Sequence, residues 1–402
     1  MEDPRNQLIR MASDAELERR WSVVRQAMRE KGIDYLVMQN SEEFLGGTLR
    51  WFTDWVADIG FPYTVIFPVD DDMTVINWGF ERPQTPQFPP AWYMRGIKNS
   101  WAAYYMPTHS YTNTIDAAMA VEALGEKKNP VVGWVEKSMI PVTFYEYVTR
   151  NLPGATFVDA TDWIDEIRVP KSPEEIEMIR DTAAMQDGCF EHLKKTIAPG
   201  MHGYDVYAEA IYFCSKRGSS RMNCMVSSGP PGTPVGPAVY HLQGRQIKEG
   251  DHVFVLVESN GPGGQWTELA RTFVVGAEPT PALREVFAHA VEGQELAARH
   301  MIPGADPKDI VAVLADFNAT SGYPSKLFDL GHGMGYSMVE RPMIRKREPM
   351  KLQANSNLAV HLESLKNFGD GAAFALCVDN FLVGPADGAE RVHRCRKELI
   401  VV

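Results

Sequence analysis

Acidic residues and histidines interrupt several apolar segments in the second half of the chain, where they could bind metal ions or transfer protons. Glu258 ends an apolar run and Glu268 follows a glycine-rich turn, so the two carboxylates are expected on the two arms of one hairpin. His361 and Glu363 share one face of a predicted strand, because side chains alternate between the two faces of a strand. Asp379 lies within another strongly apolar run, which places a carboxylate inside a further predicted strand.

His332 lies between glycines, in the sequence Gly-His-Gly-Met-Gly, and glycine lets a second backbone approach closely. Taken singly, each of these residues is more often structural or solvent-exposed than functional. If the carboxylates converge, their negative charges need compensation, because like charges that are buried together oppose ionisation. Divalent metal ions or a cationic substrate would compensate them. Several carboxylates with one imidazole suit a pair of Mn, Fe, Co or Zn ions.

The first half of the chain alternates short strands with helices. Ser13 and Glu16 form a capping-box pattern before a helix that Gly32 should end. The expected strands cover residues 33–38, 63–68, 73–78, 131–134 and 156–159, and a proline-rich loop is expected at residues 83–90. This alternation predicts an α/β domain with a partly parallel sheet, extending to about residue 165.

A helix start opens the second half. Ser172 and Glu175 occupy the N-cap and N3 positions with a proline between them, and the helix is expected to run to about Thr196. The segment around Pro199 recurs in weaker form around Pro303, and each copy lies between two helices. Two copies are too few for a solenoid. They predict a duplicated half-domain with pseudo-twofold symmetry, in which a site could form between the halves.

The composition limits the class of protein and its partners. The chain has 402 residues, a formal net charge of −12 and 45% hydrophobic residues, which excludes a disordered protein. The acidic balance argues against nucleic-acid and anionic-membrane partners, since both need clustered lysine and arginine. Five scattered cysteines favour a reducing compartment over a disulfide framework. Because no apolar run approaches the roughly 18 residues of a membrane span, we expect a cytoplasmic protein.

Short motifs follow one another in a specific order through the second half: Arg168–Ile176, Ser227–Gly229, Gly250–Asp251, Arg271–Phe273 and Gly331–Gly335. Together they resemble the creatinase/aminopeptidase P superfamily. The resemblance implies an α/β creatinase-like N-terminal domain at residues 1–165 and an α+β pita-bread catalytic domain with pseudo-twofold symmetry at residues 166–402. It also implies a homodimer in which the N-terminal domain reaches the active site of the partner.

The peptidases of this superfamily bind two metal ions. The resemblance assigns the ligand positions to Glu258, Glu268, His332, Glu363 and Asp379. Three of these residue types differ from the peptidase pattern, and the hairpin spacing is one residue shorter than in the peptidases. Every position nevertheless keeps a possible ligand, so we interpret the site as a remodelled centre for two divalent ions. A metal-free site that binds a cationic substrate is the alternative.

The resemblance also implies residues for proton transfer. His241 matches the proton-handling histidine of the superfamily, and Glu363 matches a glutamate that creatinase uses without metal. Together with His361 on the same strand face, these residues are predicted to be catalytic. The second glutamate of creatinase falls on Ala270, which argues against an unmodified creatinase mechanism.

Other positions bear on the substrate, which is expected to be a small cationic or zwitterionic molecule. Superfamily peptidases have a substrate-contacting histidine where this chain has Val339, which argues against proline-specific cleavage. The neighbouring Glu340 and Arg341 are family-like and are assigned to substrate binding. Trp51 and Trp55 belong to an aromatic cluster that could hold a cationic group by cation–π contact, and packing in the core of the N-terminal domain is the alternative.

The sequence leaves several functions open. The preferred one is metal-dependent hydrolysis of a C–N bond, amide or amidino, in a small charged substrate. A lyase that resembles dimethylsulfoniopropionate lyase is the second, because the hairpin and histidine spacings of that branch match those of this chain. An Xaa-Pro peptidase and a non-catalytic binding protein are the remaining alternatives.

Overall fold

The computed structural model describes residues 9–57, 60–78, 94–103, 115–238, 243–323, 330–369, 371–384 and 388–402. The chain divides into two compact units, an amino-terminal unit of Met11–Arg168 and a carboxy-terminal unit built on Val169–Val402. The proline-rich loop expected at residues 83–90 lies outside the described residues. Within the part of the chain that is described, no helix combines the length and the apolar character needed to cross a membrane.

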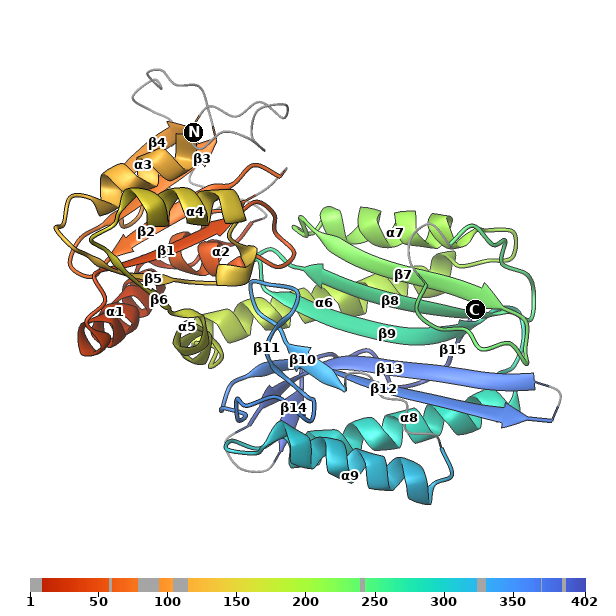
Figure 1. Ribbon diagram of the computed structural model, residues 1–402. Coiled ribbons are helices and arrows are strands. Elements are labelled where there is room, and N and C mark those ends of the chain that lie inside the picture. Colours follow the sequence, from red (N-terminus) through yellow and green to blue (C-terminus); the bar gives the residue numbers. More distant parts are fainter. Residues whose placement is uncertain are drawn as a thin grey trace. The chain divides into compact units, whose positions relative to one another are not determined.

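The amino-terminal unit contains a mixed sheet with helices packed on it (Figure 1). Its elements are α1 (Asp14–Lys31), β1 (Tyr35–Asn40), α2 (Gly47–Thr53), β2 (Tyr63–Pro68), β3 (Met73–Trp78), β4 (Ile97–Ala103), α3 (Ile115–Leu124), β5 (Val131–Trp134), the 3-10 helix η3 (Lys137–Met139), α4 (Val142–Asn151), β6 (Thr156–Asp159) and α5 (Thr161–Arg168). The strand order is β4-β3-β2-β1-β5-β6. Strands β1, β5 and β6 run parallel, whereas β1, β2 and β3 are antiparallel neighbours, so the partly parallel α/β sheet predicted from the sequence is confirmed.

The ends of α1 follow from local sequence. Ser13 accepts a hydrogen bond at the start of the helix, and Gly32 ends it with a φ of 65°, as predicted. The amide of Ile33 donates to the carbonyl of Met28 in the last helical turn. Ile33 therefore belongs to the helix cap, and β1 begins at Tyr35 rather than at residue 33 as the apolar run predicted.

The carboxy-terminal unit is a nine-stranded sheet with two pairs of helices. Its elements are α6 (Pro173–Thr196), α7 (Gly203–Ser215), β7 (Met222–Gly229), β8 (His252–Asn260), β9 (Trp266–Val274), α8 (Pro281–His300), α9 (Pro307–Thr320), β10 (Gly331–Gly333), β11 (Glu340–Met343), β12 (Asn357–Phe368), β13 (Gly371–Val383), β14 (Ala389–Arg391) and β15 (Ile400–Val401). The strand order is β11-β10-β12-β13-β9-β8-β7, with β14 paired to β13 and β15 paired to β9. The capping box of Ser172 and Glu175 and the extent of α6 are as predicted.

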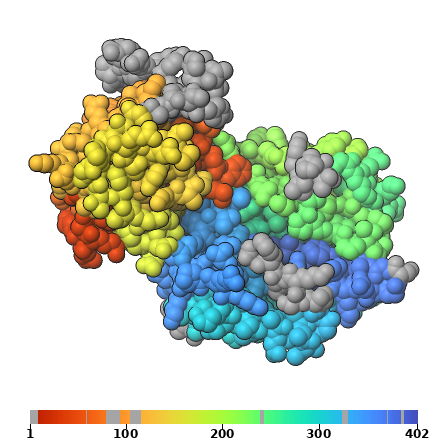
Figure 2. Space-filling model, viewed as in Figure 1, coloured from red at the N-terminus to blue at the C-terminus, as the bar shows by residue number. Residues whose placement is uncertain are grey.

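Each helix pair covers its own half of this sheet. Helices α6 and α7 lie on β7 to β9, and α8 and α9 lie on β12 and β13 (Figure 1). In the space-filling view the green first half and the blue second half of this unit pack against each other (Figure 2). Leu269 of β9 is in the core of the first half, and Val360 of β12 is in the core of the second. Residues that alternate with these core positions face the other side of the sheet.

Candidate metal centre

Three side chains from three strands converge, with two histidines close to one carboxylate oxygen of a glutamate. Glu268 of β9, His332 of β10 and His361 of β12 each present a ligand atom, and these atoms lie within 4.8 Å of one another. Nε2 of His361 lies 2.8 Å from Oε2 of Glu268, and Nε2 of His332 lies 3.7 Å from the same oxygen. The side chains of Glu268 and His332 are 4% and 8% exposed and that of His361 is 22% exposed, so the cluster is buried with one accessible edge.

Cross-strand registers place this cluster on one face of the sheet. Glu268 lies directly opposite Glu258 of β8. Val378 of β13 lies opposite both Ala270 of β9 and His361 of β12. Because directly opposed side chains share a face and side chains alternate along each strand, Glu258, Glu268, Val378 and His361 face the same side.

The short strand β10 brings His332 close to β12. A Cβ atom at Gly331, where φ is 153°, would lie 2.1 Å from the carbonyl oxygen of Ala359, so glycine permits the close approach that its sequence motif predicted. Nδ1 of His332 lies 3.0 Å from the carbonyl oxygen of Gly333. Because a carbonyl only accepts hydrogen bonds, Nδ1 is placed to donate to it, and Nε2 faces Glu268, where it could ligate a metal ion.

The two paired glutamates have different electrostatic environments. Burial and the charge of Glu268 raise the pKa of Glu258 well above its ordinary value, although Asn223 donates to Oε2 of Glu258 at 3.0 Å. Burial also opposes ionisation of Glu268, but the charge and hydrogen bond of His361, together with His332, outweigh it and lower the pKa of Glu268. Glu268 is therefore the carboxylate that ionises more readily, and Glu258 is the one that more readily retains a proton.

The donor set fits a divalent metal ion. One carboxylate and two imidazoles form a ligand set of catalytic zinc sites, which keep a further position for water or substrate. The same ligand types also bind Mn, Fe and Co. With Nδ1 of His332 protonated, its Nε2 can ligate, and an ion would replace the proton between His361 and Glu268.

Asp379 faces the other side of the sheet, which corrects the ligand set predicted from the sequence. Its cross-strand neighbour on β12 is Val360, which lies in the apolar core beneath α8. Oδ1 of Asp379 accepts a hydrogen bond from Nη2 of Arg271 at 2.8 Å, and both side chains are fully buried. Burial opposes ionisation of Asp379, but Arg271, together with His393 and Arg391, outweighs it and the pKa of Asp379 is lowered. Asp379 is thus the ion-pair partner of Arg271 and does not point towards the cluster.

His361 lies where a metal ligand was expected, and Glu363 does not. Glu363 follows His361 on the same face of β12, opposite Leu376 of β13, and it is partly exposed. Among the described residues its carboxylate is not one of the converging ligand atoms. The structure therefore places the predicted catalytic residue His361 in the ligand cluster, and it places the predicted ligand Glu363 beside that cluster.

Glu340 and Arg341, which were predicted to bind substrate, take part in ion pairs near β11. Oε2 of Glu340 lies 2.8 Å from Nζ of Lys171. Nη2 of Arg341 lies 3.0 Å from Oε1 of Glu348. The first ion pair connects β11 to the segment that precedes α6, and the second connects β11 to the segment that follows that strand.

Trp51 and Trp55 lie in the amino-terminal unit, and each is only 2% exposed. The guanidinium of Arg20 lies 5.3 Å over the ring of Trp51, and the rings of Trp55 and Tyr63 are 6.5 Å apart. The two indoles therefore pack in the core of this unit, which was the alternative to substrate binding. His241, the predicted proton-transfer residue, lies outside the described residues.

Asn380 positions the ligand strand, a role that the sequence did not reveal. Its Oδ1 accepts the backbone N–H of Glu268 at 2.6 Å, and its Nδ2 donates to Oδ1 of Asn357 at 2.9 Å. Asn380 lies two residues after Val378, so it shares the face of the cluster, and it is fully buried. The amide therefore fixes the backbone of β9 at Glu268 relative to the start of β12. Alternation along β13 would have identified Asn380 once the register of that strand was known.

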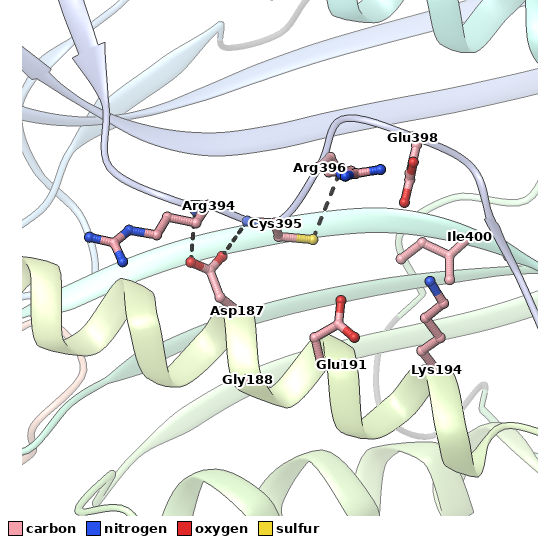
Figure 3. A pocket seen from close by; sticks show the side chains of 9 residues that line it. All are labelled: Asp187, Gly188, Glu191, Lys194, Arg394, Cys395, Arg396, Glu398 and Ile400. Atoms are coloured by element: carbon pink, nitrogen blue, oxygen red, sulfur yellow. Dashed lines mark hydrogen bonds between the residues drawn. The ribbon is translucent and has the colours of Figure 1, made fainter.

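A cavity of about 450 Å³ lies elsewhere in the carboxy-terminal unit, between α6 and the segment that precedes β15 (Figure 3). The carboxylate of Asp187 accepts hydrogen bonds from the amides of Arg394 and Cys395 at 2.7 and 2.9 Å (Figure 3). The residues that line this cavity include no member of the ligand cluster. It is therefore separate from the candidate metal centre.

Comparison with known families covers most of the chain. Residues 177–379 match the model of metallopeptidase family M24. Residues 20–169 match the model of the creatinase/prolidase N-terminal domain. The ligand cluster lies within the first of these two matches.

Curated relatives and solved structures agree with these matches. The uncharacterized peptidase YqhT of Bacillus subtilis is 28% identical over 240 residues, 59% of this chain and 65% of that protein. The probable dipeptidase PepE of Mycobacterium tuberculosis is 26% identical over 251 residues, 62% of this chain and 65% of that protein. The matched part thus spans just under two thirds of the length of these relatives.

Two solved structures resemble the chain over nearly its whole length. The X-Pro aminopeptidase from Thermotoga maritima has a TM-score of 0.75 at 17% identity and covers 95% of this chain and 99% of its own. Dipeptidase PepE from Mycobacterium ulcerans has a TM-score of 0.74 at 20% identity and covers 98% of this chain and 99% of its own. At 17% and 20% sequence identity, these two similarities establish the fold of the chain.

Proposed function

Because the chain belongs to metallopeptidase family M24, we propose that it is a metal-dependent hydrolase that cleaves an amide C–N bond in a small substrate. Its fold is the predicted creatinase-like N-terminal domain followed by a pita-bread domain. The proposal rests above all on the convergence of Glu268, His332 and His361 within the part that matches the family. Relatives named as dipeptidases make a dipeptide the first substrate class to test. An amidino bond is the second class, because its hydrolysis also breaks a C–N bond.

The residues of the centre would divide the work between binding and proton transfer. A divalent ion on Glu268, His332 and His361 would polarise a carbonyl and acidify a water molecule. Glu258, which Asn223 holds opposite Glu268, is proposed to accept the proton from that water and to pass it to the leaving nitrogen. Its raised pKa supports this role, because a carboxyl group that can hold a proton nearer neutral pH transfers it more effectively.

The region beside the centre bears on substrate selection. Val339, next to the start of β11, is partly buried and offers no side-chain hydrogen-bond donor. A site without that donor does not need proline in the second position of a dipeptide. We therefore propose a hydrolase that is not restricted to Xaa-Pro substrates.

The proposal can be tested on metal-free protein that is reloaded with Mn, Co or Zn. Dipeptides with and without proline and a small amidino compound are offered, and release of the amine is followed by mass spectrometry in water labelled with oxygen-18. Incorporation of one labelled oxygen into the carbonyl product is expected, which is the acid from a dipeptide and a urea or amide from an amidino compound, and Glu268→Gln should abolish it. Glu285→Gln, at a half-exposed glutamate of α8, serves as the matched control and should retain the activity.

Two other outcomes would change the proposal. Absence of hydrolysis across the whole panel, with metal bound, would refute it. Formation of an alkene from dimethylsulfoniopropionate, without incorporation of labelled oxygen, would replace hydrolysis by elimination. The homodimer that the superfamily resemblance implies is likewise a proposal, and sedimentation of the purified chain tests it.

A further inference from the structure

We infer that the candidate centre holds a single divalent ion, on Glu268, His332 and His361, and not the pair of ions that the sequence suggested. The inference takes from the proposed function only the premise that metal is bound. It concerns the number of ions and the residues that hold them, both of which can be measured without any substrate.

The spacing of the three donors suits one ion. Ligand atoms that each lie about 2.0–2.1 Å from a tetrahedral metal are about 3.3 Å from one another. Oε2 of Glu268 lies 2.8 Å from Nε2 of His361 and 3.7 Å from Nε2 of His332, so the observed separations lie on either side of that value. Small side-chain rotations would therefore bring the three atoms around one ion.

A second ion would lack donors on the side of the cluster formed by β9 and β13. Paired ions lie about 3.5–4 Å apart, and each needs ligands beyond the group that bridges them. The positions next to the cluster on the same face are Ala270 and Val378, which lie opposite each other and have apolar side chains without ligand atoms. The nearest carboxylate in that strand, Asp379, points into the opposite core and pairs with Arg271.

The opposite side of the cluster offers one carboxylate that is already hydrogen-bonded. Glu258 lies across from Glu268, and Oε2 of Glu258 accepts a hydrogen bond from Nδ2 of Asn223 at 3.0 Å. One carboxylate supplies at most two ligand atoms, which is fewer than a second ion needs beyond the group that bridges the two ions.

The number of ions can be counted on the full-length wild-type protein. The metal is removed with a chelator, Mn or Zn is titrated back by calorimetry, and the bound metal is measured by mass spectrometry after desalting. One equivalent per chain is expected. With Mn bound, the electron paramagnetic resonance spectrum should be that of an isolated ion, without the exchange coupling that two ions about 3.5–4 Å apart would show.

Variants identify the ligands and the missing donor. His361→Ala should weaken metal binding by more than about 100-fold, because even residues that only orient metal ligands change affinity about 10–100-fold. The matched control Glu363→Gln should keep one equivalent at nearly wild-type affinity. Val378→Glu should take up a second ion, since it adds a carboxylate opposite His361, whereas the neutral Val378→Gln should keep one.

The outcomes separate this inference from the proposed function. Two equivalents in the wild-type protein, no bound metal, or an unchanged affinity in His361→Ala would each overturn the inference. One bound ion without any hydrolysis would leave the inference intact and remove the proposed function. Hydrolysis by a protein with two exchange-coupled ions would support the proposed function and overturn the inference of a single ion.

Discussion

Replacing Asp379 by asparagine should destabilise the carboxy-terminal unit without removing its metal. In the folded protein the Asp379 carboxylate lies 2.8 Å from the guanidinium of Arg271, and neither side chain is exposed. The substitution keeps the size of the side chain and removes its charge. It therefore separates an ion pair that stabilises the fold from a ligand that would bind metal.

The expected loss of stability follows from the burial of Arg271. Breaking a buried ion pair by removing one partner costs about 3–5 kcal/mol, because the other charge stays buried without compensation. Arg271 also donates to the carbonyl oxygens of Cys395 and Arg396 at 3.2 and 2.9 Å, so part of its charge remains solvated by the backbone. We therefore expect the lower end of the range, about 3 kcal/mol, which is more than a hundredfold in the folding equilibrium.

The pH dependence gives a second signature of the same ion pair. The pKa of Asp379 is lowered in the folded state, whereas in an unfolded chain it is about 3.9. The stabilisation is therefore fully present above about pH 5 and is lost as the pH falls through the folded-state pKa. The difference between wild type and Asp379→Asn should be constant at neutral pH and should shrink below about pH 4.

Urea unfolding provides the measurement, read by hydrogen–deuterium exchange in peptides from β9 and β13. These peptides report on the carboxy-terminal unit alone, which most of the tryptophans of the chain do not. Metal content is measured on the folded fraction. A loss of stability below about 1 kcal/mol, or loss of the metal from folded protein, would refute this account of Asp379.

Further predictions concern the ligand strands, one helix and the metal itself. Asn380→Ala should weaken metal binding about 10–100-fold, measured by calorimetry, because it frees the backbone of Glu268. Gly331→Ala should lower both metal affinity and melting temperature, since its Cβ would lie 2.1 Å from a carbonyl oxygen, whereas Gly244→Ala, which meets nothing within 4 Å, should change neither. Ser172→Ala should cost about 1 kcal/mol in urea unfolding, because it removes the N-cap of α6. Chelation should lower the stability by about 2.7 kcal/mol relative to protein at a hundredfold excess of metal over Kd, and an unchanged melting temperature would contradict metal binding to the folded state.

Helix ends could be predicted from the sequence because their determinants are local. The cap of Ser172 involves only the first turn of its own helix, and Gly32 ends α1 through its own backbone conformation. The start of β1 was misplaced because the amide of Ile33 bonds to the preceding helix, and an apolar residue in a helix cap looks like the first residue of a strand. Local rules thus identify an element better than they identify its first residue.

The residue types of the metal centre could also be predicted, but not all of their directions. The alternation rule placed His361 and Glu363 on one face, as the structure has them. The direction of Asp379 depends on the register between β12 and β13, and a shift of one residue reverses the face. The turn after Phe368 sets this register, since Phe368 pairs with Gly371, and it places Val378 opposite His361. If the sequence analysis had predicted a hairpin in which Phe368 pairs with Gly371, the same register would have placed Asp379 opposite Val360 and therefore in the core.

The ligands come from the two halves of the duplicated unit, and this has a consequence for biosynthesis. Glu268 belongs to the half with β7 to β9, whereas His332 and His361 belong to the half that is translated later. Neither half has the complete set, so under the proposed assignment an ion would meet all three ligands only after β13 has left the ribosome and docked between β12 and β9. Metal uptake would then be a late step in the maturation of this protein, and a bound ion would join the two halves across the centre of the sheet.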